Sequence, residues 1–496
     1  MDLSIVLTAL SNVFSFSCLL ALSVGVIWGI VAGALPGMGS VIAITICLPF
    51  TYSMHQIDAI SLLLGVYCGS VYGGCISSIL INTPGTPQSA ATCFDGYPLA
   101  QQGKAGLALG WATLASAFGG IFSCIILIIT GPQLAKFALQ FGPIETVGLI
   151  IMALTCIACL SRENMLKGLL AGVLGLFLAS VGPDPFLGEV RFDFGFFLLS
   201  SGFDLIAVVV GIFALAEVLS RASQSGDEKP PLVTYDRMEF PHLHEITTRS
   251  KLFIKSSLIG TGVGILPGAG ATAAAFISYG EAKRSSPNSA RMGHGEPDGI
   301  IAPEAANNAV TGGALVPTLA LGLPGDAVTA IMLGTLVLHG ITPGVRLMVD
   351  NPEVVYGTFI SLFLANLIMV GGGILVARVF AKILRIPEPL LMGGIILLCL
   401  LGSYGVRGNV FDLYVTFAMG IVGFFLRYTA VNAAPMVIGL VLGNQLELGI
   451  RQGLVLTYGS FYEFLTFSVI ASVLFLISFL IIAVQLYQTI KDHKRS

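Results

Sequence analysis

The sequence has very few charged residues for its length. Only 10% of its 496 residues are Asp, Glu, Lys or Arg, whereas 55% are apolar. A soluble domain carries about 25% charged residues, so this composition excludes an ordinary soluble protein and indicates an integral membrane protein. The chain has no polybasic tract and a formal net charge of only -3, so nothing in it predicts a nucleic-acid partner.

Motifs that carry common enzyme chemistry are also missing. The sequence contains no Walker A loop, no His-Glu-x-x-His zinc motif and no Gly-x-Ser-x-Gly nucleophile turn. No other group of nucleophile, base and orienting residue is recognisable in it. We therefore expect a protein that is not an enzyme, that does not hydrolyse ATP and that needs no cofactor.

Two short glycine-proline segments interrupt long apolar stretches. We call them the first elbow, Gly33 to Gly39 (GALPGMG), and the second elbow, Gly264 to Gly270 (GILPGAG). A broken helix is tolerated in a bilayer only where the break lines a cavity or is buried in protein. Paired breaks in the two halves of a chain indicate the binding site of a secondary transporter. The elbows therefore predict substrate contacts at Pro36, Gly37, Gly39, Pro267, Gly268 and Gly270.

Hydropathy predicts eleven full-length membrane spans besides the elbows. They lie at about 60–81, 106–129, 145–160, 166–181, 203–219, 309–339, 354–380, 389–403, 413–425, 435–448 and 464–486. Each elbow arm is predicted to have about 12 residues, which rise about 18 Å as a helix, too little for a hydrocarbon core about 30 Å thick. We therefore favour re-entrant hairpins at 22–49 and 253–279, with a broken full span as the alternative.

The second half of the sequence repeats features of the first. The elbows are 231 positions apart, and Pro84-Gly85-Thr86 corresponds to Pro324-Gly325-Asp326 at an offset of 240. Two further pairs, 142–143 with 386–387 and 162–164 with 407–409, have offsets of 244 and 245. A slowly rising offset is expected of a duplicated unit with small loop insertions. An odd number of crossings in each half gives the halves opposite orientations in the membrane.

The predicted fold is an all-α polytopic integral membrane protein made of two inverted structural repeats. Each repeat has a re-entrant or broken-helix Gly-Pro hairpin plus about five transmembrane helices, and one extra helix follows at the C-terminal end. The predicted divisions are a first repeat at 1–220, a cytoplasmic linker at 221–252, a second repeat at 253–455, and a C-terminal helix and cytoplasmic tail at 456–496.

The distribution of basic residues predicts the orientation. With hairpins at both elbows, 19 of the 24 Lys and Arg residues fall on one side of the membrane, including those of the linker and the C-terminal tail. The positive-inside rule makes that side cytoplasmic. The first 103 residues contain no Lys or Arg, which favours an external N-terminus.

A polar Pro-Gly segment follows the first long span. Its hydroxyl and amide groups suit a carboxylate ligand, and its unwound backbone offers N–H and C=O groups. The predicted substrate-binding residues here are Asn82, Thr83, Pro84, Gly85, Thr86, Gln88 and Ser89, with Pro324 and Gly325 of the corresponding segment. The alternative is a tightly packed bend that needs small residues.

Acidic and amide side chains near the second elbow form the candidate ion site. Glu304, Asn307 and Asn308 would share one face of a helix that begins at Pro303, and Asp326 lies beside an intramembrane break. Such oxygen ligands suit Na⁺, or a proton if Glu304 titrates. The alternative is a capped helix start at the cytoplasmic surface. We expect Glu296 and Asp298 to be solvated and Glu217 to be a capping or snorkelling residue near a span end.

Several motifs together carry a resemblance to a known family: both elbows, Asn82 to Thr92, Asp95 to Pro98, and Ala302 to Asn308 through Gly340 to Gly344. In these motifs the sequence resembles the large membrane subunit of the tripartite tricarboxylate transporter family. The resemblance covers nearly the whole chain. It implies a secondary transporter of the bacterial inner membrane that works with a small four-helix membrane subunit and a periplasmic substrate-binding protein. It also implies uptake of citrate or another small organic acid, driven by a Na⁺ or H⁺ gradient.

The function predicted from the sequence is ion-coupled import of small di- or tricarboxylates by alternating access. A passive channel for small organic anions is one alternative, and a membrane-embedded enzyme that uses Glu304 or His294 is another. Duplicated, discontinuous helices favour alternating access over a channel.

Overall fold

The computed structural model describes residues 3–159, 165–223, 233, 235–268, 270–383 and 387–493. Within these residues the chain is helical apart from a short antiparallel hairpin of β1 (Gly182–Pro183) and β2 (Val190–Arg191). Seven helical segments are long and apolar enough to cross a membrane: Phe16–Ala34, Gln56–Ile81, Pro87–Ala138, Leu205–Ala222, Pro352–Phe380, Pro389–Arg407 and Val410–Tyr428. The prediction of an all-helical membrane protein is therefore confirmed.

Both elbows break helices where the sequence predicts. The first separates α2 (Phe16–Ala34) from α3 (Gly39–Thr51), and the second separates α12 (Ser250–Ile265) from α13 (Gly270–Ser285). The predicted arm length of about 12 residues is wrong for α2, which has 19 residues, and for α12 and α13, which have 16 each. For α2 the difference arises because Ser15 caps the helix upstream of the predicted arm, accepting a hydrogen bond from the Cys18 N–H.

Glycines bring the first arm of each elbow against the next long helix. In α2, a Cβ at Gly29 would lie 2.5 Å from the Val66 carbonyl of α4 (Gln56–Ile81), and one at Gly33 would lie 2.3 Å from the Ser70 carbonyl. In α12, a Cβ at Gly260 would lie 2.1 Å from the Ala306 carbonyl of α14 (Asp298–Leu321). Helix backbones can approach this closely only where side chains are absent.

The predicted single span at 309–339 is wrong, because the chain forms two helices there. After α14, Gly322 (φ 71°) ends the helix and α15 (Ala327–Leu338) starts after Asp326. The prediction of a helix start at Pro303 is also wrong, since α14 begins at Asp298 and contains Pro303 in its first turns. Pro303 is the sixth residue of α14, where its missing N–H leaves the Gly299 carbonyl without the usual intrahelical donor but does not end the helix.

In the first half, α4 likewise ends at a left-handed residue, Asn82 (φ 51°), and the chain continues through the 3₁₀ helix η1 (Pro87–Thr92). The segments α5 (Cys93–Leu99), η2 (Ala100–Lys104) and α6 (Ala105–Ala138) then follow without a loop. The predicted break at 82–86 is therefore present.

The remaining helices match most of the predicted spans. The predicted span at 203–219 is one continuous helical segment made of α9 (Leu205–Val209), η4 (Val210–Leu215) and α10 (Ala216–Ala222). The others are α1 (Leu3–Val13), α7 (Pro143–Cys159), α8 (Met165–Ala179), η3 (Phe197–Leu199), α11 (Leu243–Thr248), η5 (Ser289–Arg291), α16 (Leu347–Asp350), α17 (Pro352–Ile383), α18 (Glu388–Arg407), α19 (Val410–Tyr428), α20 (Ala434–Leu456), α21 (Phe461–Thr466) and α22 (Val469–His493). Within the described residues, six of the seven segments that are long and apolar enough to cross a membrane correspond to predicted spans, and the seventh, Phe16–Ala34, is the first arm of the first elbow.

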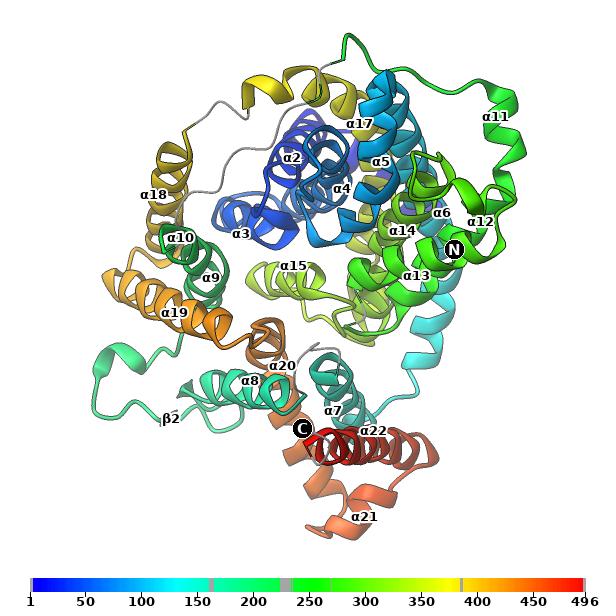
Figure 1. Cartoon of the computed structure of the whole chain (residues 1–496). Helices are drawn as coiled ribbons and strands as arrows, with labels where there is room; N and C mark the ends of the chain where they lie inside the picture. Colours follow the sequence, from blue (N-terminus) through cyan, green and yellow to red (C-terminus); the bar gives the residue numbers. More distant parts are fainter. Residues whose placement is uncertain are drawn as a thin grey trace.

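The two largest hydrophobic cores among the described residues join most of the helices. The larger core joins α2, α4, α6, α14 and α17, and a smaller one joins α7, α20 and α22 with Leu323 and Ala330 beside the α14–α15 break. Figure 1 shows α15 in the middle of the molecule, between these two groups. Parts of three predictions lie outside the described residues: the 162–164 and 386 positions of the repeat, residues 224–232 and 234 of the linker, and the last basic residues at 494–495.

Candidate functional site

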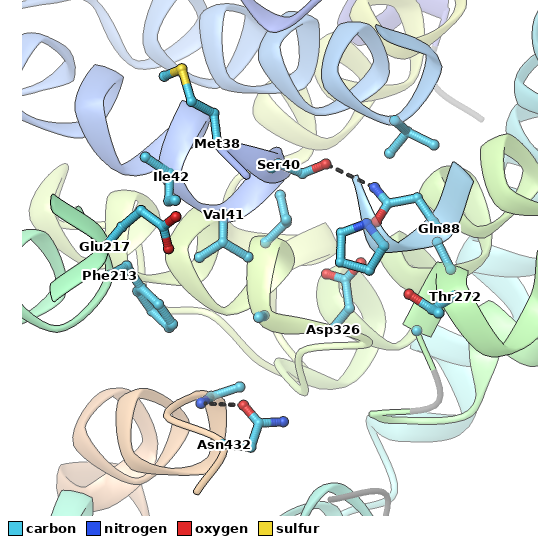
Figure 2. A pocket seen from close by; sticks show the side chains of 18 of the residues that line it. Met38, Ser40, Val41, Ile42, Gln88, Phe213, Glu217, Thr272, Asp326 and Asn432 are labelled. Atoms are coloured by element: carbon cyan, nitrogen blue, oxygen red, sulfur yellow. Dashed lines mark hydrogen bonds between the residues drawn. The ribbon is translucent and has the colours of Figure 1, made fainter. Parts of the chain in front are cut away.

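A cavity of about 850 Å³ lies where the two elbows meet. Gly37 and Gly39 of the first elbow line it, and so do Gly268 and Gly270 of the second. Gly85 and Asp326, from the two Pro-Gly segments, complete the same wall. Figure 2 shows this cavity with Ser40, Gln88, Asp326 and Thr272 toward one end and Glu217 with Phe213 toward the other. Residues of both elbows and of both Pro-Gly segments, which are distant in the sequence, therefore line one cavity.

The backbone of both elbows has the same unusual conformation. Gly37 (φ 82°) and Gly39 (φ 64°) lie in the left-handed region, as do Gly268 (φ 87°) and Gly270 (φ 68°). Helices α3 and α13 then begin at the cavity. No described side chain caps the first turn of α3. Its N–H groups and the positive end of its dipole are therefore free to interact with an anion in the cavity.

Neutral polar side chains lie next to the start of α3. The Gln88 Nε2 donates a hydrogen bond to the Ser40 Oγ at 2.9 Å, drawn as a dashed line in Figure 2. Thr272 of α13 and Asn432, in the α19–α20 connection, line the cavity as well. Of the predicted polar residues in the 82–89 segment, Gln88 is the one whose side chain reaches this cavity.

Asp326 caps α15 at the cavity wall. Its Oδ1 accepts hydrogen bonds from the Thr329 N–H at 2.8 Å and the Thr329 Oγ1 at 2.9 Å. Its Oδ2 accepts one from the Tyr67 hydroxyl of α4. The N-terminus of α15 is thus already occupied by a carboxylate, in contrast to that of α3.

Three charged residues at the cavity were missed. Glu217 of α10 is buried and pairs with Arg221 at 2.8 Å and with Arg427 of α19, and both Glu217 and Arg427 line the cavity. The Arg221 guanidinium also donates to the Pro36 carbonyl in the first elbow. The cavity therefore contains a fixed positive charge, Arg427, in addition to the neutral polar groups predicted from the sequence. The sequence did contain an indication of this site, because Glu217 is an acidic residue in an otherwise apolar helix. We instead predicted it to be a capping or snorkelling residue near a span end.

Other predicted substrate residues lie behind the cavity wall. The Ser89 Oγ donates to the Thr86 carbonyl at 2.8 Å, and the two side chains form a capping box at the start of η1. Thr83 bonds back to the Ile81 carbonyl, and Asn82 is an exposed helix end. These groups, together with Pro36, Pro84, Pro267, Pro324 and Gly325, shape the bends and are absent from the described cavity lining.

The predicted ion-site residues of α14 lie together but outside this cavity. Glu304 is fully buried and accepts hydrogen bonds from the Thr92 Oγ1 at 2.5 Å and the Ser116 Oγ at 3.1 Å. Asn308 donates to the Asn307 Oδ1 at 2.7 Å, while the Asn308 Oδ1 is buried without a described partner. Asp326 is not part of this cluster.

A short series of polar groups joins the Glu304 cluster to the cavity. The Asn307 Nδ2 donates to the Gln88 carbonyl at 3.3 Å, and the Gln88 side chain reaches Ser40 at the cavity wall. Among the described residues, no group of three or more His, Cys, Asp or Glu side chains is placed to hold a metal ion. Any cation bound here would rely on amide, hydroxyl and carbonyl oxygens together with the single carboxylate.

The expectation that Glu296 and Asp298 are solvated is wrong. Both are buried and pair with Arg249, at 3.2 and 2.8 Å. Burial raises the pKa of Glu296 above its ordinary value, although the hydrogen bond from Arg249 opposes this. The neighbouring backbone is fixed by Asp95, whose Oδ1 accepts the N–H groups of Gly293, Gly295 and Glu296. This polar segment is therefore a structural connection between distant parts of the chain.

The helical membrane architecture, with broken helices around one cavity, is that expected of a multi-pass membrane transport subunit. Residues 19–438 match the tripartite tricarboxylate transporter TctA family, and the chain belongs to this family. The resemblance noted from the motifs is thereby confirmed.

Two relatives come from Agrobacterium vitis. The chain is 35% identical over 453 residues to an uncharacterized 52.8 kDa protein in the TAR-I ttuC' 3' region, with 91% of this chain and 90% of that protein aligned. It is also 35% identical over 215 residues to an uncharacterized protein in the TAR-II ttuC' 3' region, with 43% of this chain and 89% of that protein aligned. No solved structure matches the chain.

Proposed function

We propose that this chain is the large permease subunit of a binding-protein-dependent secondary transporter that imports small di- or tricarboxylates, such as citrate, by alternating access. The observation that carries the proposal is the convergence of both elbows, the open start of α3 and Arg427 on one cavity. Helix N-termini and an arginine are the groups that bind carboxylates best.

The carboxylates would bind at the elbows. One carboxylate of the substrate would accept hydrogen bonds from N–H groups at the start of α3, beside Ser40 and Gln88. A second carboxylate would lie at the start of α13, beside Thr272. Arg427 would attract the negative charge of the substrate at the opposite end of the cavity. Thr86 and Ser89 would act indirectly by fixing the bend that carries Gln88.

The coupling site would lie beside the substrate site. Glu304, Asn307 and Asn308 would hold Na⁺ or a proton, and Asp326 would complete the ion-dependent part of the cavity wall. A buried carboxylate without a described cationic partner is costly unless it is protonated or binds a cation. The contacts from Asn307 to the Gln88 carbonyl and from Gln88 to Ser40 would link ion binding to substrate binding.

The two inverted repeats remain part of the proposal. In both halves an elbow arm packs through glycines against the next long helix, and a Pro-Gly break follows that helix. The elbow and the break also touch in both halves: the Gly268 N–H donates to the Gly325 carbonyl at 2.7 Å, and a Cβ at Gly85 would lie 2.0 Å from the Gly33 carbonyl. This agreement supports a duplicated unit at 1–220 and 253–455.

The family is one of three-part systems, so we infer two partners: a small four-helix membrane subunit and a periplasmic substrate-binding protein. The chain would lie in the bacterial inner membrane with a periplasmic N-terminus and a cytoplasmic linker and C-terminus. Arg191 and Arg451 share the partners Asp184 and Glu447, which supports placing these two residues on the same side of the membrane.

The test is uptake of radiolabelled di- and tricarboxylates into liposomes that contain this chain and the small membrane subunit, with and without binding protein, under Na⁺ or H⁺ gradients. We expect saturable uptake that needs the binding protein and one gradient. Flux that is unsaturable and independent of a gradient would show a channel and contradict the proposal.

Arg427→Gln tests the site, with Arg407→Gln as its matched control. Arg407 is about as exposed as Arg427 (35% against 36%) and pairs with Asp204 at 2.9 Å, but it does not line the cavity. We expect Arg427→Gln to raise the KM for dicarboxylates and Arg407→Gln to leave it unchanged. Equal effects would place the substrate elsewhere. Asp326→Ala and Thr86→Val extend the test. If both variants keep the rate of uptake and its ion dependence, the substrate and ion sites do not lie at this wall of the cavity.

A further inference from the structure

The connection between α8 and α9 carries a concentration of exposed aromatic side chains. We call residues 182–199 the aromatic hairpin. Phe194 is 66% exposed and Phe197 is 86% exposed, and Phe186, Phe192 and Phe196 are exposed as well. Figure 1 shows the hairpin at the edge of the molecule, where β2 projects beyond α8. Exposed aromatic groups of this size on a soluble face would favour aggregation, so a partner surface is expected to cover them.

Charged residues fix the base of the hairpin to α20. The Asp184 Oδ1 accepts the N–H groups of Phe186 and Leu187, and the Asp184 Oδ2 lies 2.7 Å from Arg451 of α20. Arg191 donates two hydrogen bonds to Glu447 of α20, at 2.6 and 2.8 Å. The hairpin is therefore held at a fixed height relative to the helix bundle.

The backbone of the hairpin is strained at two of its aromatic residues. Phe192 (φ 52°) and Phe194 (φ 49°) are in the left-handed region, which bulky residues rarely adopt. Such strain persists only where the surrounding structure enforces it, and it is often associated with function. Here it accompanies outward aromatic side chains, with the charged contacts on the inner side.

The aromatic surface continues onto lipid-facing helices. The Phe192 ring packs against Phe177 of α8 with centroids 5.8 Å apart. Phe177 belongs to an exposed apolar stripe of α8 that includes Leu170 and Leu174. In a multi-pass membrane protein, a stripe of this kind contacts hydrocarbon.

A second aromatic segment lies at the same end of the bundle. Beyond the hairpin contacts at Glu447 and Arg451, α20 ends at Leu456 and is followed by Tyr458 (96% exposed), Phe461 and Tyr462. Aromatic residues concentrate at the level of the lipid headgroups in membrane proteins. Two aromatic segments at one end of α20 mark that level.

We propose that the aromatic hairpin lies in the lipid headgroup–acyl boundary and anchors the α8–α20 pair at a fixed depth in the bilayer. The partner is the lipid surface, because the exposed rings continue the lipid-facing stripe of α8 and the charged groups face inward. An amphipathic element with an apolar outer face and a polar inner contact is suited to that boundary. This inference does not depend on the transported substrate.

Nitroxide labels test the proposal on the full chain in lipid nanodiscs, in the complex with its small membrane subunit and as the single chain. The label is placed by Phe194→Cys, with Leu170→Cys as the lipid reference and Thr247→Cys of α11 as the exposed aqueous reference; the unsubstituted chain gives the background from native cysteines. Collision rates with oxygen and with a water-soluble nickel chelate are then measured. We expect the oxygen-to-nickel ratio at 194 to lie well above that at 247 and below that at 170, as a position at the headgroup–acyl boundary requires.

A ratio equal to that at 247 would place the hairpin in water and overturn the proposal. Protection from both reagents in the complex would show that protein covers it, which overturns the proposal too. Phe196→Cys provides a second label position if Phe194→Cys does not fold. Asp184→Asn, which weakens the contact with α20, is expected to shift the label toward nickel access and to increase its mobility.

Discussion

Replacing Gly37 with alanine should damage the first elbow far more than the same change at Gly39. Both glycines have a positive φ, which costs another residue about 1–2 kcal/mol. At Gly39 a Cβ would meet no heavy atom within 4 Å, so this strain is the whole cost. At Gly37 the Cβ would lie 1.5 Å from the Arg221 Nη2, so the guanidinium must leave.

The departure of Arg221 removes its hydrogen bond to the Pro36 carbonyl. A hydrogen bond to a charged group contributes about 1.5–3 kcal/mol. Gly37→Ala should therefore cost about 2.5–5 kcal/mol in all, against about 1–2 kcal/mol for Gly39→Ala. The loss will be divided between stability and carboxylate affinity, because the strained elbow is part of the proposed binding site.

The assay combines thermal unfolding of the purified chain with equilibrium binding of a radiolabelled dicarboxylate. Arg221→Ser completes a double-mutant cycle: with the guanidinium already absent, Gly37→Ala should add only its backbone strain. Equal losses for Gly37→Ala and Gly39→Ala, or additive losses in the cycle, would refute the reasoning that Arg221 holds the elbow.

Four further predictions follow from other contacts. Asp326→Asn should keep most of the α15 cap but weaken ion dependence, whereas Asp326→Ala should also lose about 0.5–2 kcal/mol of stability; uptake against ion concentration and unfolding curves separate the two. Glu304→Gln should abolish gradient-driven uptake and retain carboxylate binding, measured on the same preparation, and full coupling would exclude Glu304. Gly29→Ala should destabilise the α2–α4 contact by about 1–3 kcal/mol, since its Cβ would lie 2.5 Å from the Val66 carbonyl; unchanged thermal stability would contradict that packing. The Leu187 N–H and other donors lower the pKa of Asp184 from 3.8 to about 2. The contribution of Asp184 to the stability of the hairpin is therefore complete above about pH 4 and is lost as the pH falls toward 2. The mobility of a label at residue 194 should rise as the pH falls from about 4 to 2, and this rise should be absent in Asp184→Asn.

The positions of the elbows could be predicted from the sequence because their cause is local. A Pro-Gly pair flanked by glycines cannot continue a helix, so the breaks at Pro36 and Pro267 follow from residue chemistry alone. The length of α2 was underestimated because a cap at Ser15 extends it. Local rules also misplaced the start of α14, since proline is accepted within its first turns at Pro303.

The polar residues of the site were harder to predict because their partners are distant in the sequence. The pair of Glu217 and Arg427 joins positions 210 residues apart, and spacing along the chain carries no information about such a contact. Conversely, Thr86 and Ser89 looked available for a ligand but satisfy each other within one helical turn. A hydroxyl that can cap its own helix start is a weak indicator of binding.

The separation of Glu304 from the cavity restricts how ion and substrate could be coupled under the proposed function. Glu304 contacts Thr92 and Ser116 but not the cavity, so a bound cation or proton could not touch a carboxylate at the elbows. Coupling would then have to pass through protein groups that contact both sites. Gln88 meets this requirement, since its carbonyl accepts from Asn307 and its side chain donates to Ser40 at the start of α3. Movement of the η1 bend that carries Gln88 would therefore change both sites together, as alternating access demands.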